Sequence, residues 1–137
     1  MIINAENLIL GRLGAFVAKK SLLGEEIKII NCKGAVIVGK KDEILSRYRQ
    51  KRERTTPRKG PFIPKTSYRL VKRSIRGMLP YKKERGRTAL KRVICYNSVP
   101  ESLKSKEITT LKSLNVLHSK NVNFIKVQDI CKHLGGK

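Results

Sequence analysis

Positive charge is concentrated in the middle of this 137-residue chain, and that concentration limits where a hydrophobic core can form. Residues 40–92 hold 20 Lys and Arg residues against 4 Asp and Glu residues, which gives them +16 of the total formal charge of +22. Unpaired ammonium and guanidinium groups are costly to bury. The core must therefore come mainly from the flanking parts, whose charges are +2 over residues 1–39 and +4 over residues 93–137.

The first 39 residues predict a strand–helix–strand unit. A short strand at residues 2–3 precedes a helical pattern over residues 11–23, for which Gly24 is a suitable stop. The β-branched run over residues 27–32 then predicts a mostly buried strand, and this order of elements implies parallel pairing. Residues 36–38 predict a further short strand, so the chain begins as an α/β fold.

Helices, a loop and one more strand are expected in the remainder of the chain. The spacing of apolar residues predicts helices over residues 40–50, 66–79 and 86–92, a strand over 93–96 and a C-terminal helix within 123–136. That last helix is expected to pack on this domain or on a neighbouring protein. Residues 51–64 contain three prolines and a glycine, so they predict an extended loop that becomes ordered against a partner.

The helix expected over residues 66–79 has two different sides. Its apolar side and its cationic side are formed by Tyr68, Val71, Ile75 and Met78, and by Arg69, Lys72, Arg73 and Arg76, respectively. At 100° per residue, the centres of the two sides lie about 120° apart. One side can therefore face a core while the other faces a phosphate backbone.

The charge indicates a polyanionic partner, which would relieve the mutual repulsion of the cations. A membrane surface is a poorer partner, because Trp is absent and no basic segment has a wide apolar face. The first residues lack the pattern of a signal peptide, and no run approaches 18 apolar residues. A soluble cytosolic protein of one domain is the expectation, with residues 1–39 as its βαβ start, 40–92 as its basic binding segment and 93–137 as its final strand and tail.

The cysteines and glycines indicate structural roles. Cys32, Cys95 and Cys131 form no Cys-x-x-Cys pair and predict buried reduced thiols. Cys131 and His133 could supply two metal ligands, but no motif supplies the others, so no metal site is expected. The Gly11–Gly14 stretch lacks the spacing of a dinucleotide-binding fingerprint, so close packing of a helix is favoured over cofactor binding.

Several ordered blocks of the sequence resemble a known family. The blocks are Asn4-Ala5, Leu10-Gly11-Arg12-Leu13, Asn31-Cys32-Lys33, Val36-Ile37-Val38-Gly39, Ile75-Arg76-Gly77-Met78-Leu79-Pro80, Gly86-Arg87 and Val93-Ile94-Cys95-Tyr96. Together they resemble the large-ribosomal-subunit protein thirteen family over roughly residues 1–98. The Pro57–Phe62 stretch and the missing bacterial-type N-terminal extension resemble the archaeal and eukaryotic branch.

The resemblance implies a fold, a role and partners. The implied fold is a three-layer α/β/α domain with a mainly parallel sheet of about four strands, here joined by a basic loop–helix extension and a C-terminal helix. The implied role is non-catalytic: binding of large-subunit ribosomal RNA and support of subunit assembly, beside neighbouring ribosomal proteins in the cytoplasm. No cofactor, metal or small-molecule substrate is implied.

The expected RNA contacts are cationic residues of the basic segment, together with Arg12 at the positive start of the first helix and a glycine that lets RNA approach the backbone. The family motif places contacts at Arg12, Lys40, Lys41, Arg76, Gly77, Lys82, Lys83, Arg85 and Arg87. The charge distribution adds Arg47, Arg49, Lys51, Arg52, Arg54, Arg58, Lys59, Lys65, Arg69, Lys72 and Arg73. Tyr48, Phe62, Tyr68 and Tyr81 could stack on bases, although a core position suits Tyr48 and Tyr68 better.

Two other classes of function stay open from the sequence. An enzyme acting on RNA would need an acid–base pair, a carboxylate cluster or a nucleophile motif, and the sequence contains no such pattern. A DNA-compacting protein would explain the charge equally well. It is disfavoured because the sequence has neither a helix-turn-helix nor an arm-and-wedge pattern.

Overall fold

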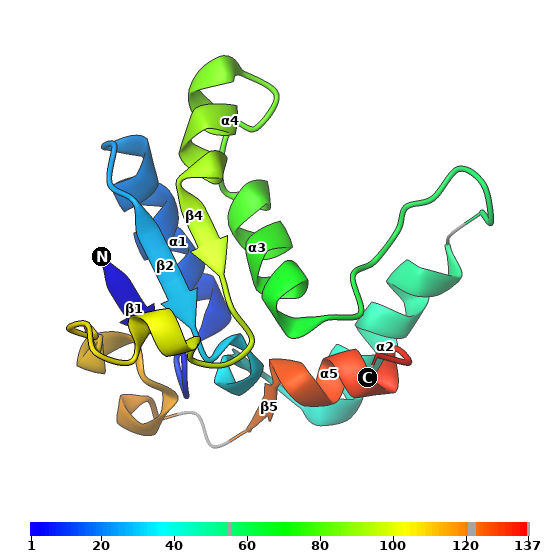
Figure 1. The fold of residues 1–137 in the computed structure, drawn as a ribbon. Coiled ribbons are helices and arrows are strands. Elements are labelled where there is room, and N and C mark those ends of the chain that lie inside the picture. Colours follow the sequence, from blue (N-terminus) through cyan, green and yellow to red (C-terminus); the bar gives the residue numbers. More distant parts are fainter. Residues whose placement is uncertain (55, 121–122, 137) are drawn as a thin grey trace.

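The computed structural model describes residues 1–54, 56–120 and 123–136. Its helices are α1 (Leu10–Leu22), α2 (Lys41–Glu53), α3 (Ser67–Gly77), α4 (Glu84–Lys91) and α5 (Val127–His133). Its strands are β1 (Ile2–Asn4), β2 (Ile27–Ile30), β3 (Val36–Val38), β4 (Val93–Cys95) and β5 (Phe124–Lys126). Short 3-10 turns are η1 (Cys32–Gly34), η2 (Glu101–Leu103), η3 (Lys112–Leu114) and η4 (Val116–His118). Figure 1 shows their arrangement.

Three strands form a parallel sheet in the order β1-β2-β4, with β2 in the centre. Ile3 of β1 is opposite Ile29 of β2, which is in turn opposite Cys95 of β4. The α/β class and the parallel βαβ start are therefore confirmed. On the outer side of β1, Thr109 forms an isolated bridge, because its N–H lies 2.8 Å from the carbonyl oxygen of Ile2.

The expected parallel sheet of about four strands included β3. In the structure, β3 lies outside the parallel sheet. It pairs instead with β5 in a two-stranded antiparallel sheet, with Ile37 opposite Ile125. A parallel neighbour of β2 would need a long crossover, and only five residues, 31–35, which include the left-handed Asn31 and turn η1, separate β3 from β2. The Val36 N–H donates to the Leu8 carbonyl at 2.9 Å, which fixes β3 beside the segment that leads into α1.

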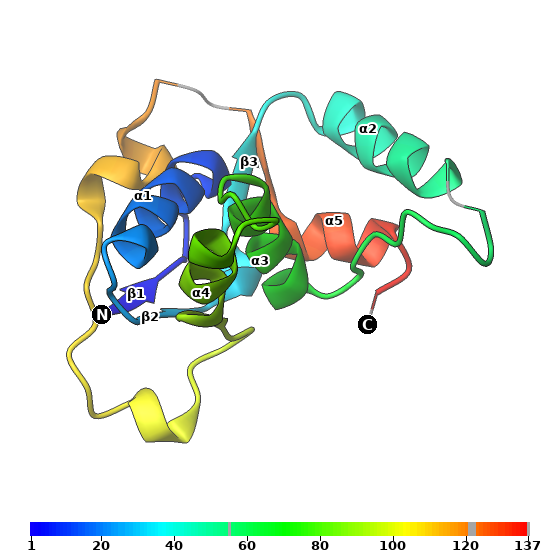
Figure 2. The same cartoon turned by 90° about the horizontal axis from the view of Figure 1, so that it is seen from above.

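The parallel sheet has helices on one face. Figure 2 shows α1, α3 and α4 on that face, while the segment after β4, with η2, crosses the opposite side. Ile94 of β4 remains 41% exposed, in keeping with this lighter cover. Instead of the second helical layer that the resemblance implied, the described residues place a turn-rich segment there. No helix in the described part of the chain is long and apolar enough to span a bilayer.

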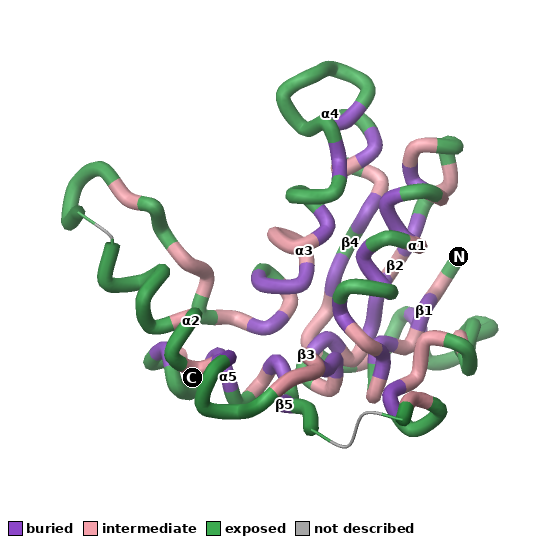
Figure 3. The backbone as a smooth tube through the Cα atoms, turned by 180° about the vertical axis from the view of Figure 1, so that it is seen from behind, coloured by how far each residue is buried: buried purple, intermediate pink, exposed green. Residues whose placement is uncertain are grey.

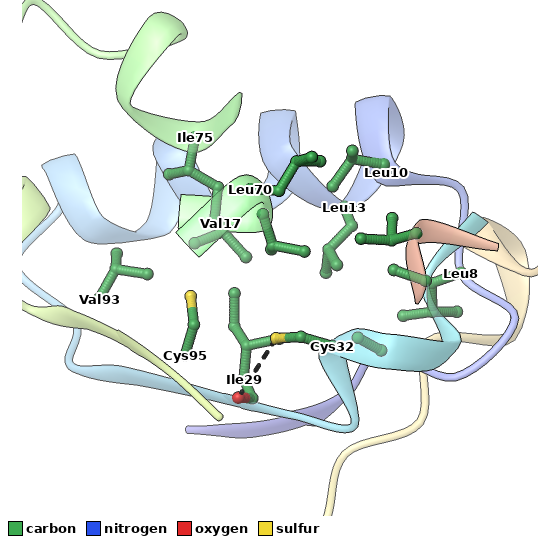
Figure 4. Close-up of a cluster of buried hydrophobic side chains, with 14 of the residues drawn as sticks. Leu8, Leu10, Leu13, Val17, Ile29, Cys32, Leu70, Ile75, Val93 and Cys95 are labelled. Atoms are coloured by element: carbon green, nitrogen blue, oxygen red, sulfur yellow. Dashed lines mark hydrogen bonds between the residues drawn. The ribbon is translucent and has the colours of Figure 1, made fainter. Parts of the chain in front are cut away.

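The core lies between the sheet and α1 and α3. Figure 4 shows Leu13 and Val17 of α1, Leu70 and Ile75 of α3 and Ile29 of β2 converging in one apolar cluster. Each fully buried side chain of this kind stabilises the fold by about 1.5–3 kcal/mol relative to exposure. The flanking segments do supply most of the core, as the charge distribution required, and α3 is the element of the basic segment that adds most to it.

The helices begin and end within a few residues of their expected positions. Gly24, with a φ of +105°, follows α1 as the stop signal indicated. Helix α2 extends to Glu53, three residues into the stretch predicted as loop, because the first proline comes only at Pro57. Helix α5 packs on this chain rather than outward: Val127, Ile130, Cys131 and Leu134 are buried against α2, α3 and η1.

Gly14 and Gly86 each permit a close approach between elements. A Cβ atom on Gly14 would lie 2.8 Å from the Met78 Sδ atom, so the expected close helix packing holds at this glycine but not at Gly11, whose surroundings are open. A Cβ atom on Gly86 would lie 2.1 Å from the Pro80 carbonyl oxygen. The first contact could be relieved by a flexible side chain, whereas the second is with backbone.

We expect Gly86→Ala to destabilise the protein by about 3 kcal/mol, because the new methyl group overlaps the Pro80 backbone and α4 must shift. Urea denaturation followed by circular dichroism measures the change. Gly77→Ala is the matched control, since nothing lies within 4 Å of its added Cβ and alanine favours helix. Equal stability of the two variants would contradict this role of Gly86.

The three cysteines are free and buried, which confirms the prediction of buried reduced thiols. Cys32 and Cys95 lie together in the core, and the Cys32 thiol donates to the Ile29 carbonyl at 3.8 Å, as Figure 4 shows. The neighbouring Cys95 thiol and burial raise the pKa of Cys32. Burial also raises the pKa of Cys131. We expect Ellman's reagent at pH 8 to modify the thiols of the folded protein roughly 100-fold more slowly than those of the urea-unfolded protein. Rapid reaction of the folded protein would contradict the burial.

Candidate nucleic-acid interface

The basic segment forms two arms. Helix α2 and the Pro-rich loop after it (residues 56–66) make one arm, and α3 with α4 makes the other, as Figure 1 shows. In Figure 3 both arms are largely exposed apart from the inner side of α3. We use the name basic surface for the exposed cationic residues of these two arms.

The structure distributes the predicted contact residues over both arms and one outlying helix. Helix α2 and its N-cap contain Lys40, Lys41, Arg47, Arg49, Lys51 and Arg52, and the following turn and loop contain Arg54, Arg58, Lys59 and Lys65. Helix α3 contains Arg69, Lys72, Arg73, Arg76 and Gly77, and α4 with the turn before it contains Lys82, Lys83, Arg85 and Arg87. Arg12 lies in the first turn of α1 and is exposed. All of these residues are exposed except Lys72 and Arg73, which are half-buried.

Helix α3 has the two sides that its sequence predicted. Val71 and Ile75 are buried against the core, together with Leu70, which the prediction did not include. Met78 departs from the prediction: it lies just beyond α3 and is 43% exposed, although its sulfur covers Gly14. Leu79, by contrast, is buried and anchors the end of the helix.

A groove of about 380 Å³ runs between the two arms, and we name it the α2–α3 groove. Its lining residues come from α2, from the Pro-rich loop and from α3: Tyr48, Lys51, Arg54, Pro61, Ile63, Pro64, Leu70, Arg73, Ser74 and Gly77. The lining includes three cations and no carboxylate. Sequence periodicity could not reveal this groove, because it depends on how two separate helices are placed.

A second hollow lies on the outer side of α3. It has a volume of about 280 Å³ and is lined by Pro64, Leu90 and four cations of α3: Arg69, Lys72, Arg73 and Arg76. The cationic side predicted for α3 therefore forms one wall of a concave surface. Arg73 lines both hollows and stands between them.

Some of the predicted contact residues also hold the fold together. The Arg73 guanidinium donates a hydrogen bond to the carbonyl oxygen of Phe62 and ties the Pro-rich loop to α3. Arg52 donates to the Leu134 carbonyl at 3.2 Å, and Arg49 lies 3.3 Å from the His133 ring, so both tie α2 to the end of α5. These partners are distant in sequence, and no local pattern could have identified them.

Other cations of the basic surface have few internal partners. Within the described residues, Lys40 is the one cation of residues 40–92 that forms an ion pair, at 3.7 Å from Glu43. The side chains of Lys82, Arg85 and Arg87 make no hydrogen bond or ion pair there. Their charge is balanced only by solvent ions, so it is available to a polyanion.

The aromatic residues fall into two groups. Tyr48 and Tyr68 are half-buried against the core, as predicted, and Lys51 and Arg69 lie over their rings at 5.2 and 5.6 Å. Burial raises the pKa of Tyr48, so its phenol stays neutral at physiological pH. In the second group, Phe62 is 64% exposed, and Tyr81 is 39% exposed with the Arg76 guanidinium 5.0 Å from its ring centre.

The described residues contain no group of three or more His, Cys, Asp or Glu side chains that could hold a metal ion. His133 of α5 is instead beside Arg49. The α2–α3 groove and the second hollow are lined by cations and apolar groups. Such a lining suits an anionic partner with flat apolar parts.

Comparison with known proteins finds relatives over nearly the whole length of this chain. A family model described as ribosomal protein L13 matches residues 1–102. The large ribosomal subunit protein uL13 of Methanosarcina barkeri is 42% identical over 137 residues, covering 99% of this chain and 98% of that protein. The proteins of the same name from Picrophilus torridus and Methanocaldococcus jannaschii are 44% and 42% identical, covering 97% and 99% of this chain and 95% and 98% of their own lengths.

These relatives are archaeal, in agreement with the branch that the sequence resembled, and their similarity continues through the C-terminal tail, where the motifs are sparse. The family match and the similarity over nearly the whole length show that this chain belongs to the ribosomal protein L13 family.

Proposed function

We propose that this protein is a structural, non-catalytic component of the large ribosomal subunit and binds its ribosomal RNA through the basic surface. The observation that supports this most directly is the pair of cationic arms, whose charges are largely unbalanced by the rest of the described chain. Relatives that match over nearly the full length are named large ribosomal subunit proteins, which supports ribosomal RNA as the anionic partner.

The proposed mechanism is electrostatic and geometric. Lys and Arg side chains neutralise phosphates and release the ions condensed around RNA, so affinity falls steeply with salt. Arg predominates among the proposed contacts and can bind phosphate oxygens in a bidentate manner. Recognition would follow from the shape of the folded RNA, because the deep major groove of A-form RNA hides the base edges.

We further propose that residues 1–137 act as a single domain within the cytoplasmic ribosome. Supporting this, β1, α1, α3, β4 and α5 all contribute to one apolar cluster, so the basic arms rest on the same core as the two ends of the chain. The domain would support assembly of the subunit by holding RNA segments on both arms. Its other partners would be neighbouring ribosomal proteins.

Sedimentation tests the proposal. In a sucrose gradient of gently lysed cells, we expect the tagged protein to migrate with large subunits and to be released only by ribonuclease or very high salt. Migration as a free small protein under every condition would contradict the proposal. The two alternative functions, an enzyme acting on RNA and a DNA-compacting protein, would then be favoured.

Charge reversal tests the surface itself. The triple variant Lys82→Glu, Arg85→Glu, Arg87→Glu changes exposed side chains without internal partners in the described chain, so the fold should stay intact. If the protein neutralises ~8 phosphates, log affinity should fall with log salt at a slope of about −7. The variant should make the slope shallower by about 3, to about −4. Fluorescence anisotropy of labelled large-subunit RNA at several salt concentrations measures both slopes.

The matched control is Lys104→Glu, Lys106→Glu, Lys112→Glu, which changes the net charge equally at exposed positions outside the basic segment. We expect this control to keep most of the affinity and to enter subunits. Equal losses in the two triple variants would mean that total charge, and not the basic surface, governs binding. Arg73 is left unchanged because its loss would also release the Pro-rich loop.

A further inference from the structure

We propose that the α2–α3 groove holds one unstacked nucleotide of the RNA, with the base against its apolar floor and the flanking phosphates at its cationic rim. This inference rests on the proposed function and adds to it a specific kind of RNA feature. The inference gives the groove a role that differs from that of the rest of the basic surface. The groove would bind a base, whereas the rest of the surface would bind only the phosphate backbone.

The floor of the groove is apolar in a way that backbone binding does not require. Leu70 is buried, and Ile63, Pro64 and Tyr48 are half-buried, so carbon atoms form much of the surface between the cations. A paired RNA helix presents phosphates and hydroxyl groups outward and would leave this floor unused. An unstacked base has an apolar face that can cover it.

The size of the groove also suits a single base. Its volume of about 380 Å³ falls within the range of ~300–1,000 Å³ that is typical for small ligands. An A-form duplex is far too wide to enter a space between two helices of one small domain. Only a nucleotide that has left the stack can reach the floor.

The rim provides the complementary charge. Lys51 and Arg54 stand on the α2 side and Arg73 on the α3 side, so a nucleotide between them meets cations in both directions along its backbone. The hydrogen bond from Arg73 to the Phe62 carbonyl fixes that guanidinium at the rim before any ligand arrives. An apolar protein segment would fill the floor but leave three cations without partners, so charge complementarity favours RNA.

Two RNA hairpins of equal length test the inference with the full-length protein. One is fully paired, and the other has a single bulged 2-aminopurine nucleotide. We expect the bulged hairpin to bind about tenfold more tightly, which corresponds to about 1.4 kcal/mol at 25 °C, and the 2-aminopurine emission to change on binding. The gain is in the range found for stacking of one base on a protein side chain.

The variant Ser74→Leu blocks the groove. Within the described residues, the Ser74 hydroxyl donates a hydrogen bond only to the Leu70 carbonyl of its own helix, at 3.2 Å, so leucine leaves no buried polar group there without a partner. We expect this variant to lose the preference for the bulge and to bind the paired hairpin as the parent protein does. Ser102→Leu, the same change at an exposed position of η2, should keep the preference.

Each other outcome counts against the inference in a different way. If the parent protein binds both hairpins equally, the groove does not hold a base, and the proposed function stands. If it binds neither hairpin at ~0.15 M salt, where basic RNA-binding surfaces should still bind, the proposed function fails as well. If Ser74→Leu keeps the preference, the base binds elsewhere. If Ser74→Leu keeps the parent protein's binding to both hairpins but does not enter subunits, a protein segment occupies the groove instead.

Discussion

The packing of α3 against α1 and the sheet is the interaction on which the rest of the structure depends. Leu70, Val71 and Ile75 are buried on its inner side, and Arg69 and Arg76 project from its outer side. A helix of eleven residues would be marginal alone, so its apolar side must supply the stability that lets closely spaced cations remain ordered. The proposed anionic partner would thus meet a surface built on the core.

The arginines of this protein serve structure as well as charge. Arg73 fixes the Pro-rich loop, and Arg49 and Arg52 fix α2 to the end of α5. A count of cations would therefore overstate the number of phosphate contacts expected, because a guanidinium already bonded to a carbonyl has fewer donors left. Lysines and arginines without internal partners, such as Lys82 and Arg85, fit the simpler electrostatic role.

Local sequence patterns predicted what depends on local physics. The period of apolar residues placed α1, α3 and α5, and the strand–helix–strand order predicted the parallel pairing of β1 and β2. The antiparallel partner of β3 could not be predicted, because β5 lies almost ninety residues later and follows a segment with weak patterns. The groove and the bonds of Arg49, Arg52 and Arg73 likewise depend on contacts between distant elements, and a single sequence does not encode those in any periodicity.

Charge repulsion sets the last constraint, since the cations of α2 and α3 face each other across the groove. Lys51 and Arg54 on one side repel Arg73 on the other. An exposed arm buries little apolar surface, so its packing alone would not keep the two sides together. The anchoring of α2 to α5, the buried Ile44 and the bond from Arg73 to the loop oppose that repulsion. An anion between the arms turns repulsion into attraction from both sides. The same geometry that makes the free arm costly to hold therefore supports the proposal that the groove holds a negatively charged occupant.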